Sequence, residues 1–223
     1  MCTSVPYGHL SQAVRHVLGK AVPERAGGGW AKVCIEVLTG TDPRNDEHYA
    51  FLPVMTGWGG GGAFWGYDGE PCVGCIEVAG AAMTGDVETV EHMVPMHIHR
   101  YELDPDSACP GRWRGGWGPV MEFSPVDHTS KVSTIGDGMK FPPPSVLGGG
   151  SPVGKGRVFH KYILGPEGRQ SIALHTVNDV REDQCMEIHC AGGGGVGNPF
   201  ERDVNAVLED VRGGLVSIEC ARG

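Results

Sequence analysis

His97 and His99 are the first side chains whose types and spacing could support chemistry. They alternate along residues 96–103, which we expect to be a strand, so both imidazoles should face the same side of it. With Cys72 and Cys75, which form a C-x-x-C pair, they would supply the four ligands of a structural zinc site. We favour reduced cysteines in a core or a turn, because a lone C-x-x-C leaves two ligands to be found elsewhere. Further possible donors are Cys185, His189 and Cys190.

Arg112 and Arg114 form a second candidate group, in a loop dense in glycine and charged residues. In an extended chain their side chains share one face, where two guanidinium groups could bind a carboxylate or a phosphate bidentately. They could equally pair with Asp104 and Asp106 and lock the loop. A direct role predicts that Arg114→Ala lowers activity more than about tenfold while assembly stays intact. The candidate catalytic residues are therefore His97, His99, Arg112 and Arg114, with Asp104 and Asp106 holding the loop.

Glycine-rich runs resemble cofactor loops, but their contexts argue against cofactor binding. Residues 192–197 fit G-x-G-x-x-G between an expected strand and helix, as a dinucleotide-binding unit requires. The 223 residues leave no room for the remaining strands of such a sheet, so we predict a tight turn before a terminal helix. Residues 149–155 lack the Ser or Thr that should follow in a phosphate loop, which predicts a surface turn. Glycine and aromatic residues alternate over residues 56–69, as in a loop packed against a neighbour or in a pocket wall.

The composition excludes several classes of function. The chain has 223 residues, of which 37 glycines and 16 prolines make up roughly a quarter. They alternate with apolar runs without a period, which is typical of many short strands joined by tight turns. The net charge of −9 argues against a nucleic-acid partner, because phosphate binding requires a basic surface. We find no membrane span and no signal peptide, and therefore expect a cytoplasmic protein with reduced cysteines.

Apolar periodicity predicts an α+β fold that is rich in short strands and has a helix near each end. Residues 8–22 should form an amphipathic helix that ends at Pro23, with a shared face of Leu10, Val14, Val17 and Leu18. A terminal helix over residues 204–211 should be capped by Asp203. Strands are expected at 32–38, 49–55, 96–103, 120–123, 131–135, 158–164, 171–175 and 186–190. Residues 88–96 are expected to be a short connecting segment, with a possible domain seam near 80–95.

Motifs in three places resemble one known family, in the order that the family has them. Residues 100–118 read RYELDPDSACPGRWRGGWG, similar to R-Y-E-L-R-x-D-S-G-G-x-G-x-x-R-G-G-x-G. Residues 141–150, FPPPSVLGGG, resemble an F-P-P-W-G-x-x-G-G turn. Residues 190–217 resemble the ending T-P-G-G-G-G-Y-G-D-P-x-E-R-D followed by a helix and G-L-V-S. These motifs identify the hydantoinase B/5-oxoprolinase group, which includes the matching subunits of acetone and acetophenone carboxylases.

The resemblance covers nearly the whole chain but only the C-terminal part of a B-type subunit. It implies either a fragment or a split subunit, and we favour a split subunit whose N-terminal part is a separate partner. The sequence departs from the family pattern at residues 107–109, at Val196 and at Asn198. These departures imply an unusual substrate or catalytic groups placed elsewhere.

The resemblance also implies a mechanism. An A-type partner with an actin-like site would use ATP and Mg to phosphorylate the carbonyl oxygen of a small substrate. Hydantoins and lactams would then be hydrolysed, whereas ketones would be carboxylated with bicarbonate. The family's metal ligands, where present, lie in the N-terminal part of the B-type subunit. A split organisation tilts the expectation slightly towards an aromatic ketone carboxylase, by analogy alone.

Two readings from other classes stay open at this point. The chain could be a non-catalytic scaffold that closes a partner's active site, as its acidic charge and glycine–aromatic loop would suit. It could also be a small zinc-binding module built on Cys72, Cys75, His97 and His99.

Overall fold

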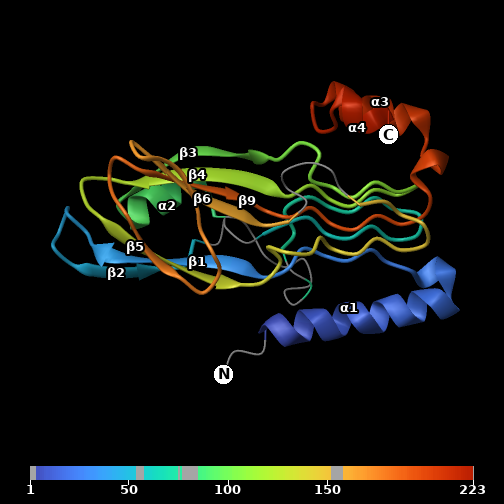
Figure 1. Cartoon of the computed structure of the whole chain (residues 1–223), viewed down its shortest axis with the longest axis horizontal. Helices are drawn as coiled ribbons and strands as arrows, with labels where there is room; N and C mark the ends of the chain where they lie inside the picture. Colours follow the sequence, from blue (N-terminus) through green and yellow to red (C-terminus); the bar gives the residue numbers. More distant parts are fainter. Residues whose placement is uncertain (1–3, 54–57, 75, 77–84, 152–157, 223) are drawn as a thin grey trace.

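A computed structural model describes residues 4–53, 58–74, 76, 85–151 and 158–222. The fold is α+β and rich in strands, as the sequence predicts. One antiparallel sheet has the strand order β2-β1-β5-β8 and the other has the order β3-β4-β9-β6-β7 (Figure 1). The strands are β1 (Cys34–Thr41), β2 (His48–Phe51), β3 (Met96–Leu103), β4 (Pro119–Pro125), β5 (Ser130–Gly136), β6 (His160–Gly165), β7 (Gly168–Ser171), β8 (Val177–Val180) and β9 (Cys185–His189).

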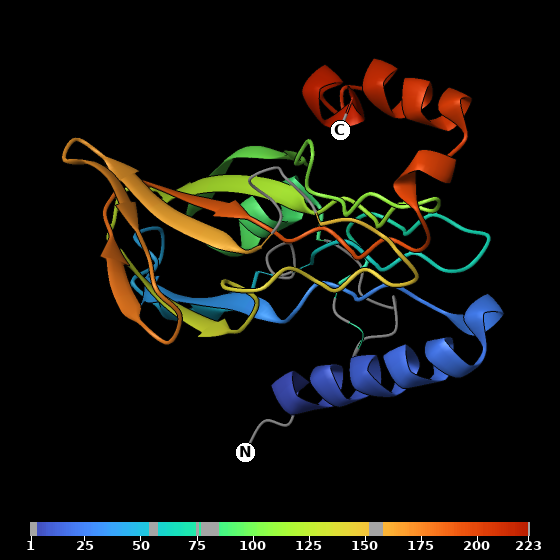
Figure 2. The ribbon, with the colours of Figure 1, turned by 45° about the vertical axis from the view of Figure 1, so that its right-hand side comes forward.

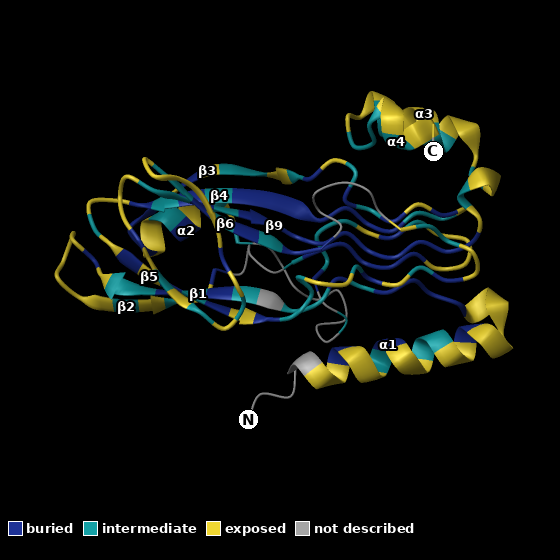
Figure 3. Cartoon of the chain, viewed as in Figure 1, coloured by how far each residue is buried: buried dark blue, intermediate teal, exposed yellow. Residues whose placement is uncertain are grey.

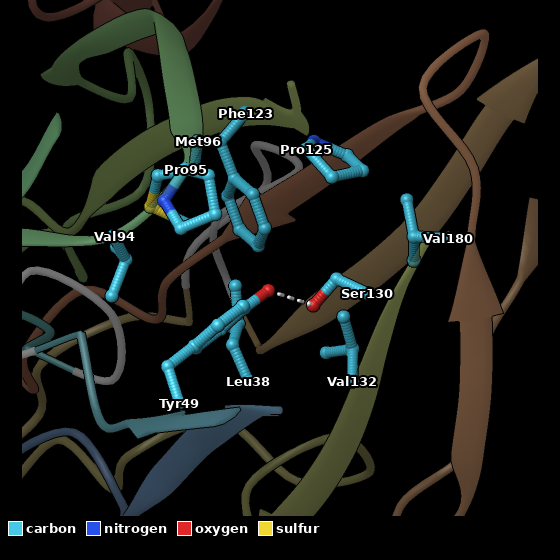
Figure 4. Close-up of a pocket in the computed structure, with 10 residues that line it drawn as sticks. All are labelled: Leu38, Tyr49, Val94, Pro95, Met96, Phe123, Pro125, Ser130, Val132 and Val180. Carbon is cyan, nitrogen blue, oxygen red and sulfur yellow. Dashed lines mark hydrogen bonds between the residues drawn. The ribbon is translucent and has the colours of Figure 1, made fainter. Parts of the chain in front are cut away.

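Apolar side chains from both sheets meet in one core. Leu38 and Val132 come from one sheet and Phe123 from the other, and all are nearly or fully buried (Figure 4). At the edge of this core the hydroxyl of Tyr49 donates to Ser130 Oγ at 3.0 Å. Along β4 and β5, buried residues alternate with less buried ones over most of each strand. The alternation arises because successive side chains of a strand point to opposite faces of the sheet.

A charged pair also lies inside this core. Lys161 of β6 and Glu36 of β1 form an ion pair whose side chains are both fully buried. The pair joins the two sheets. Two charges withdrawn from water are stable only when each compensates the other, so neither can be removed alone without cost.

Beyond the sheets, glycine-rich segments run side by side as a bundle of extended chains (Figures 1 and 2). We call this region the glycine bundle. Its segments are residues 26–31, 59–63, 69–74, 107–118, 143–150 and 190–197.

Successive backbone groups of residues 190–197 bond to different neighbours instead of one partner strand. The N–H of Gly193 donates to the carbonyl of Gly116 at 2.8 Å. The next N–H, that of Gly194, donates to the carbonyl of Gly29 at 2.7 Å. A threefold, polyproline II-like chain aims its backbone groups in this way, because each residue is turned by a third of a revolution from the last.

Glycine is required here for space and not for a left-handed backbone. A Cβ added to Gly193 would lie 1.9 Å from the carbonyl oxygen of Gly61. Within residues 192–197, positive φ occurs at Gly197 alone, at 76°. The predicted tight turn at residues 192–197 was therefore wrong: the segment is a fully buried, extended chain inside the bundle.

Helix α1 (Ser4–Ala21) packs on the glycine bundle through small and polar residues. Gly8, Gln12 and Gly19 are buried, and Gln12 Nε2 donates to the carbonyl of Trp30 at 2.7 Å. A Cβ on Gly19 would lie 3.0 Å from Ala26, so the helix and the bundle are in close contact. The predicted apolar face points into solvent, as Figure 3 shows along the outer side of α1.

The C-terminal elements are attached to the bundle without a buried residue of their own. They are the short η4 (Pro199–Glu201), α3 (Val204–Arg212) and α4 (Ile218–Arg222). Asp203 caps α3 as predicted, since its side chain accepts from the N–H of Asn205 at 2.9 Å. Ion pairs and hydrogen bonds hold these elements on the bundle.

Elsewhere the strand predictions are mostly confirmed, with shifted ends. Residues 88–96, predicted as a connecting segment, instead contain helix α2 (Val87–Met93), which Asp86 caps and which buries Val90 in the core. The predicted strand at 171–175 was wrong for most of its length, because β7 ends at Ser171 and His175 adopts positive φ. Strand β8 follows and was not predicted.

Candidate functional site

Four charged side chains join the C-terminal helices to the glycine bundle, and we call them the charge cluster: Asp68, Arg114, Arg202 and Asp210. Arg202 spans the two carboxylates, with Nη1 2.7 Å from Asp68 and Nη2 3.0 Å from Asp210. Arg114 Nε lies 3.2 Å from Asp210. Arg114 belongs to the bundle and Asp68 immediately precedes its segment 69–74, whereas Arg202 precedes α3 and Asp210 lies within it. The cluster therefore ties α3 to the bundle.

Burial and ion pairing shift the pKa values of the charge cluster in opposite directions. Burial alone would raise the pKa of Asp68, but hydrogen bonds and charge from Arg202 hold it below its ordinary value. Burial would likewise lower the pKa of Arg202, but its two carboxylate partners raise it. For Arg114 burial dominates and lowers the pKa, although Asp210 and Asp68 oppose this effect.

A cavity of about 440 Å³ opens between the bundle and the C-terminal helices. This volume is within the range of small-molecule sites. Arg114, Arg202 and Asp210 form its charged side, and Trp117 contributes its ring, over which the Arg114 guanidinium lies 3.4 Å from the centroid. Val207 and Cys220 line the side formed by the helices. The combination of apolar walls and fixed charges suits a small organic ligand with one polar end.

Arg112 does not join Arg114 in this cavity. It lines a second, shallower hollow, lies over the ring of Trp113 and has Glu201 at 3.6 Å. The predicted shared face was wrong, because the two guanidinium groups line different hollows and have different carboxylate partners, Glu201 for Arg112 and Asp210 for Arg114.

The predicted pairing of these arginines with Asp104 and Asp106 was also wrong. Asp104 is buried and accepts from His189 Nδ1 at 2.8 Å, and His189 in turn contacts Glu187 at 2.9 Å. Asp106 accepts from the N–H of Ser217 at 2.7 Å and so fixes the segment between α3 and α4. Both aspartates therefore do hold the loop, but through a buried histidine and a backbone amide instead of through arginine.

His97 and His99 do share one side of β3, as predicted, and their rings lie 4.8 Å apart. Both are exposed on this edge strand; His97 pairs with Glu91 of α2 at 2.9 Å and His99 Nε2 lies 2.9 Å from Ser124 Oγ. The histidines line neither hollow of the arginines and, within the described residues, share no partner with them. The structure therefore does not bring the histidines and the arginines into one site.

One of the four ligands of the hypothetical zinc site, Cys75, lies outside the described residues. Burial raises the pKa of the Cys72 thiol to about 11, so it is protonated near neutral pH. Among the residues that the structure describes, no group of three or more His, Cys, Asp or Glu side chains is placed to hold a metal ion. The phosphate-loop-like run at 149–155 also lies mostly outside them.

Sequence reasoning missed Asp68, His189 and Asp210 as partners of the predicted residues. Along the chain, Asp68 lies 46 residues and Asp210 lies 96 residues from Arg114. His189 lies 85 residues from Asp104. No local spacing reports such contacts, because the bundle brings together segments that are far apart in sequence.

In the described part of the chain, no helix has the length and hydropathy needed to span a membrane.

Comparison with known proteins shows what this arrangement resembles. The caprolactamase beta subunit of Pseudomonas jessenii is 35% identical over 99% of this chain, which covers 38% of that subunit. The crystal structure of the ATP-dependent caprolactamase from that organism matches 99% of this chain and 38% of its own with a TM-score of 0.87, at 31% identity. The nucleotide-free structure of acetone carboxylase matches 92% of this chain and 31% of its own with a TM-score of 0.76, at 20% identity.

This chain thus spans little more than a third of the length of these relatives. The family model for hydantoinase B/oxoprolinase matches residues 1–199, which include the glycine bundle and both sheets. The chain belongs to the hydantoinase B/oxoprolinase family.

Proposed function

We propose that this chain forms the C-terminal part of the B-type component of an ATP-dependent, multi-subunit enzyme that opens a cyclic amide. The observation that carries the proposal is the 35% identity to a caprolactamase beta subunit over 99% of the chain. Acetone carboxylase, at 20% identity, supports the shared fold alone. This evidence shifts our preference from the ketone carboxylation expected from the split organisation to lactam hydrolysis.

The chemistry explains the need for ATP. A lactam carbonyl is a weak electrophile, because the ring nitrogen delocalises its lone pair into it. Transfer of a phosphoryl group from ATP, with Mg, on an A-type partner would turn the carbonyl oxygen into part of a leaving group. One water then adds at the carbon and the ring C–N bond breaks, and a second water releases phosphate. The balance is lactam, ATP and two waters to amino acid, ADP and phosphate.

Within this chain the two arginines suit different roles. The Arg114 guanidinium donates to Asp210 and to the carbonyls of Gly69 and Gly115, and its side chain is 14% exposed. We assign it to positioning α3 and one wall of the cavity. Arg112 is 48% exposed and has Glu201 at 3.6 Å, so its donors remain accessible to an anionic group of substrate or product.

His97 and His99 remain proposed functional residues in a separate place. Exposed on the β3 edge, they would have to complete a site with groups from the rest of the component. This role predicts that His97→Ala with His99→Ala lowers turnover by the complex without changing the unfolding temperature of this chain.

The test is a substrate screen on the complex purified from its native host, with ADP and amino acid product both measured. The proposal expects lactam-dependent ADP formation with an equal amount of amino acid, and no requirement for bicarbonate. ADP formation that requires a ketone and bicarbonate would overturn it in favour of carboxylation. Full lactam turnover by a complex lacking residues 1–223 would also overturn a catalytic contribution of this chain.

A further inference from the structure

Helix α1 has its amphipathic character turned outward. Its apolar side chains form a stripe at helical spacing, and each is at least half exposed: Tyr7, Leu10, Val14, Val17 and Leu18. A surface helix of a globular protein normally turns such a stripe towards the core. Here the buried side carries Gly8, Gln12 and Gly19 instead (Figure 3).

The inward face of α1 makes specific contacts, so the orientation is not a matter of loose packing. Gln12 donates to the carbonyl of Trp30 at 2.7 Å and accepts from Lys32. The Arg15 guanidinium lies over the ring of Phe64, 4.8 Å from its centroid. Rotating the helix to bury its apolar stripe would break these contacts and would place bulky side chains where Gly19 now meets Ala26.

The relatives are longer than this chain and so contain a further surface that the stripe can contact. This chain matches 38% of the caprolactamase beta subunit, so most of that subunit lies outside the matched part. A continuous exposed apolar surface of this kind marks an interaction site. The stripe belongs to an element without acidic residues in a chain whose net charge is −9, so the covering surface should be apolar with an acidic or neutral rim.

We propose that the outer face of α1 docks against the part of the B-type component that lies outside residues 1–223. This proposal rests on the proposed function for the identity of the partner but not on the reaction. In the assembled component the stripe of Tyr7 to Leu18 is buried, and α1 lies between the glycine bundle and the remaining part. The polar inner face and the apolar outer face of α1 are then each matched to a neighbour.

Photocrosslinking in the native complex tests this directly. A photoreactive side chain is placed at Val17, which is 66% exposed, and in a control protein at Val177, which is 65% exposed on β8. The crosslinked peptide from Val17 is expected to come from B-type sequence outside residues 1–223. A Val17 crosslink to a second copy of α1, to the ATP-binding subunit or to no peptide overturns the proposal.

A charge variant gives a second readout. Val14→Glu with Val17→Glu is expected to lower recovery of the complex at least about tenfold, because burying two carboxylates in an apolar contact is costly. The matched change Val177→Glu is expected to leave recovery unchanged. Thermal unfolding of the isolated chain should be the same in all variants, since these side chains are exposed. Neither readout needs turnover, so a failed lactam assay leaves this test standing, and normal recovery of the double variant would refute the docking.

Discussion

The two sheets and the glycine bundle are both buried, but they exclude water by opposite means. Between the sheets, side chains such as Phe123 and Val132 fill the space. In the bundle, neighbouring backbones lie so close at most of the glycines that no side chain would fit, and a Cβ on Gly193 would lie 1.9 Å from a carbonyl oxygen. The first region is stabilised by apolar area removed from water, the second by backbone hydrogen bonds in a site that solvent does not reach.

This difference explains where the polar groups lie. The side chains inside the bundle are mostly small or apolar, such as Ala63 and Val196, so chemistry must come from its rim, where Asp68 and Arg114 project towards α3. The sheets instead carry a charge inside, at Lys161 and Glu36, which no surface reaction can use. A rigid backbone bundle with charged side chains at its surface is a suitable support for a binding site.

The largest expected effect comes from the charge inside the sheets. Lys161→Met should destabilise the chain by about 3–5 kcal/mol, because it leaves Glu36 buried without its partner. The double variant Glu36→Leu with Lys161→Met should recover most of this loss, since a buried pair is replaceable by apolar groups of similar volume. Urea unfolding of the three proteins measures both. Equal stability of the double variant and Lys161→Met would contradict this account.

The comparison predicts a similarly large effect from a single methyl group in the bundle. Gly193→Ala should cost about 3 kcal/mol or more, because its Cβ would lie 1.9 Å from the Gly61 oxygen and backbone must move. Gly213→Ala is the matched control: its φ is −71° and its Cβ meets nothing closer than 3.3 Å. The control should be neutral or slightly stabilising. Thermal unfolding distinguishes them, and equal melting temperatures would break the comparison.

Breaking the charge cluster at the rim of the bundle should destabilise α3 without affecting the sheets. Arg202→Met removes the cation between Asp68 and Asp210, and charged hydrogen bonds of this kind are worth about 1.5–3 kcal/mol. Amide exchange in α3 should accelerate at least about tenfold, while the sheets exchange as before. Arg212→Met, at the exposed end of the same helix, should change little. Acceleration throughout the chain would show that α3 is not a separately held element.

The smallest expected effect is a change in stability with pH that depends on His189, the last residue of β9 before the bundle. Burial lowers the pKa of His189, but Asp104 and Glu187 outweigh this and raise it above its ordinary value. A raised folded-state pKa stabilises the protein below about pH 6.5, and the gain is lost as pH rises through the folded-state value. His189→Gln should therefore lower the melting temperature by about 2 °C more at pH 6 than at pH 9. An equal difference at both pH values would exclude a charged His189.

The sheets could be predicted from the sequence because their signal is local. Alternating burial places β3 at Met96–Leu103 as predicted, and the Asp203 cap sets the start of α3. The bundle could not be predicted, because glycine carries no periodicity and its steric requirement comes from segments far away in the sequence, 132 residues in the case of Gly61 and Gly193. The same distance hides the partners of Arg114. The orientation of α1 was unpredictable for a different reason: its apolar stripe is present, but the contacts with the bundle bury the opposite side of the helix, with Gly8, Gln12 and Gly19.

Amide hydrogen exchange of residues 191–197 tests most directly whether the glycine bundle is a second core. The N–H groups of residues 193–197 donate to neighbouring segments and residues 191–197 are fully buried, so the account predicts protection of residues 193–197 comparable to that of β9, which pairs between β4 and β6. Exchange of these glycines at the rate of an open loop, while β9 stays protected, would contradict the account.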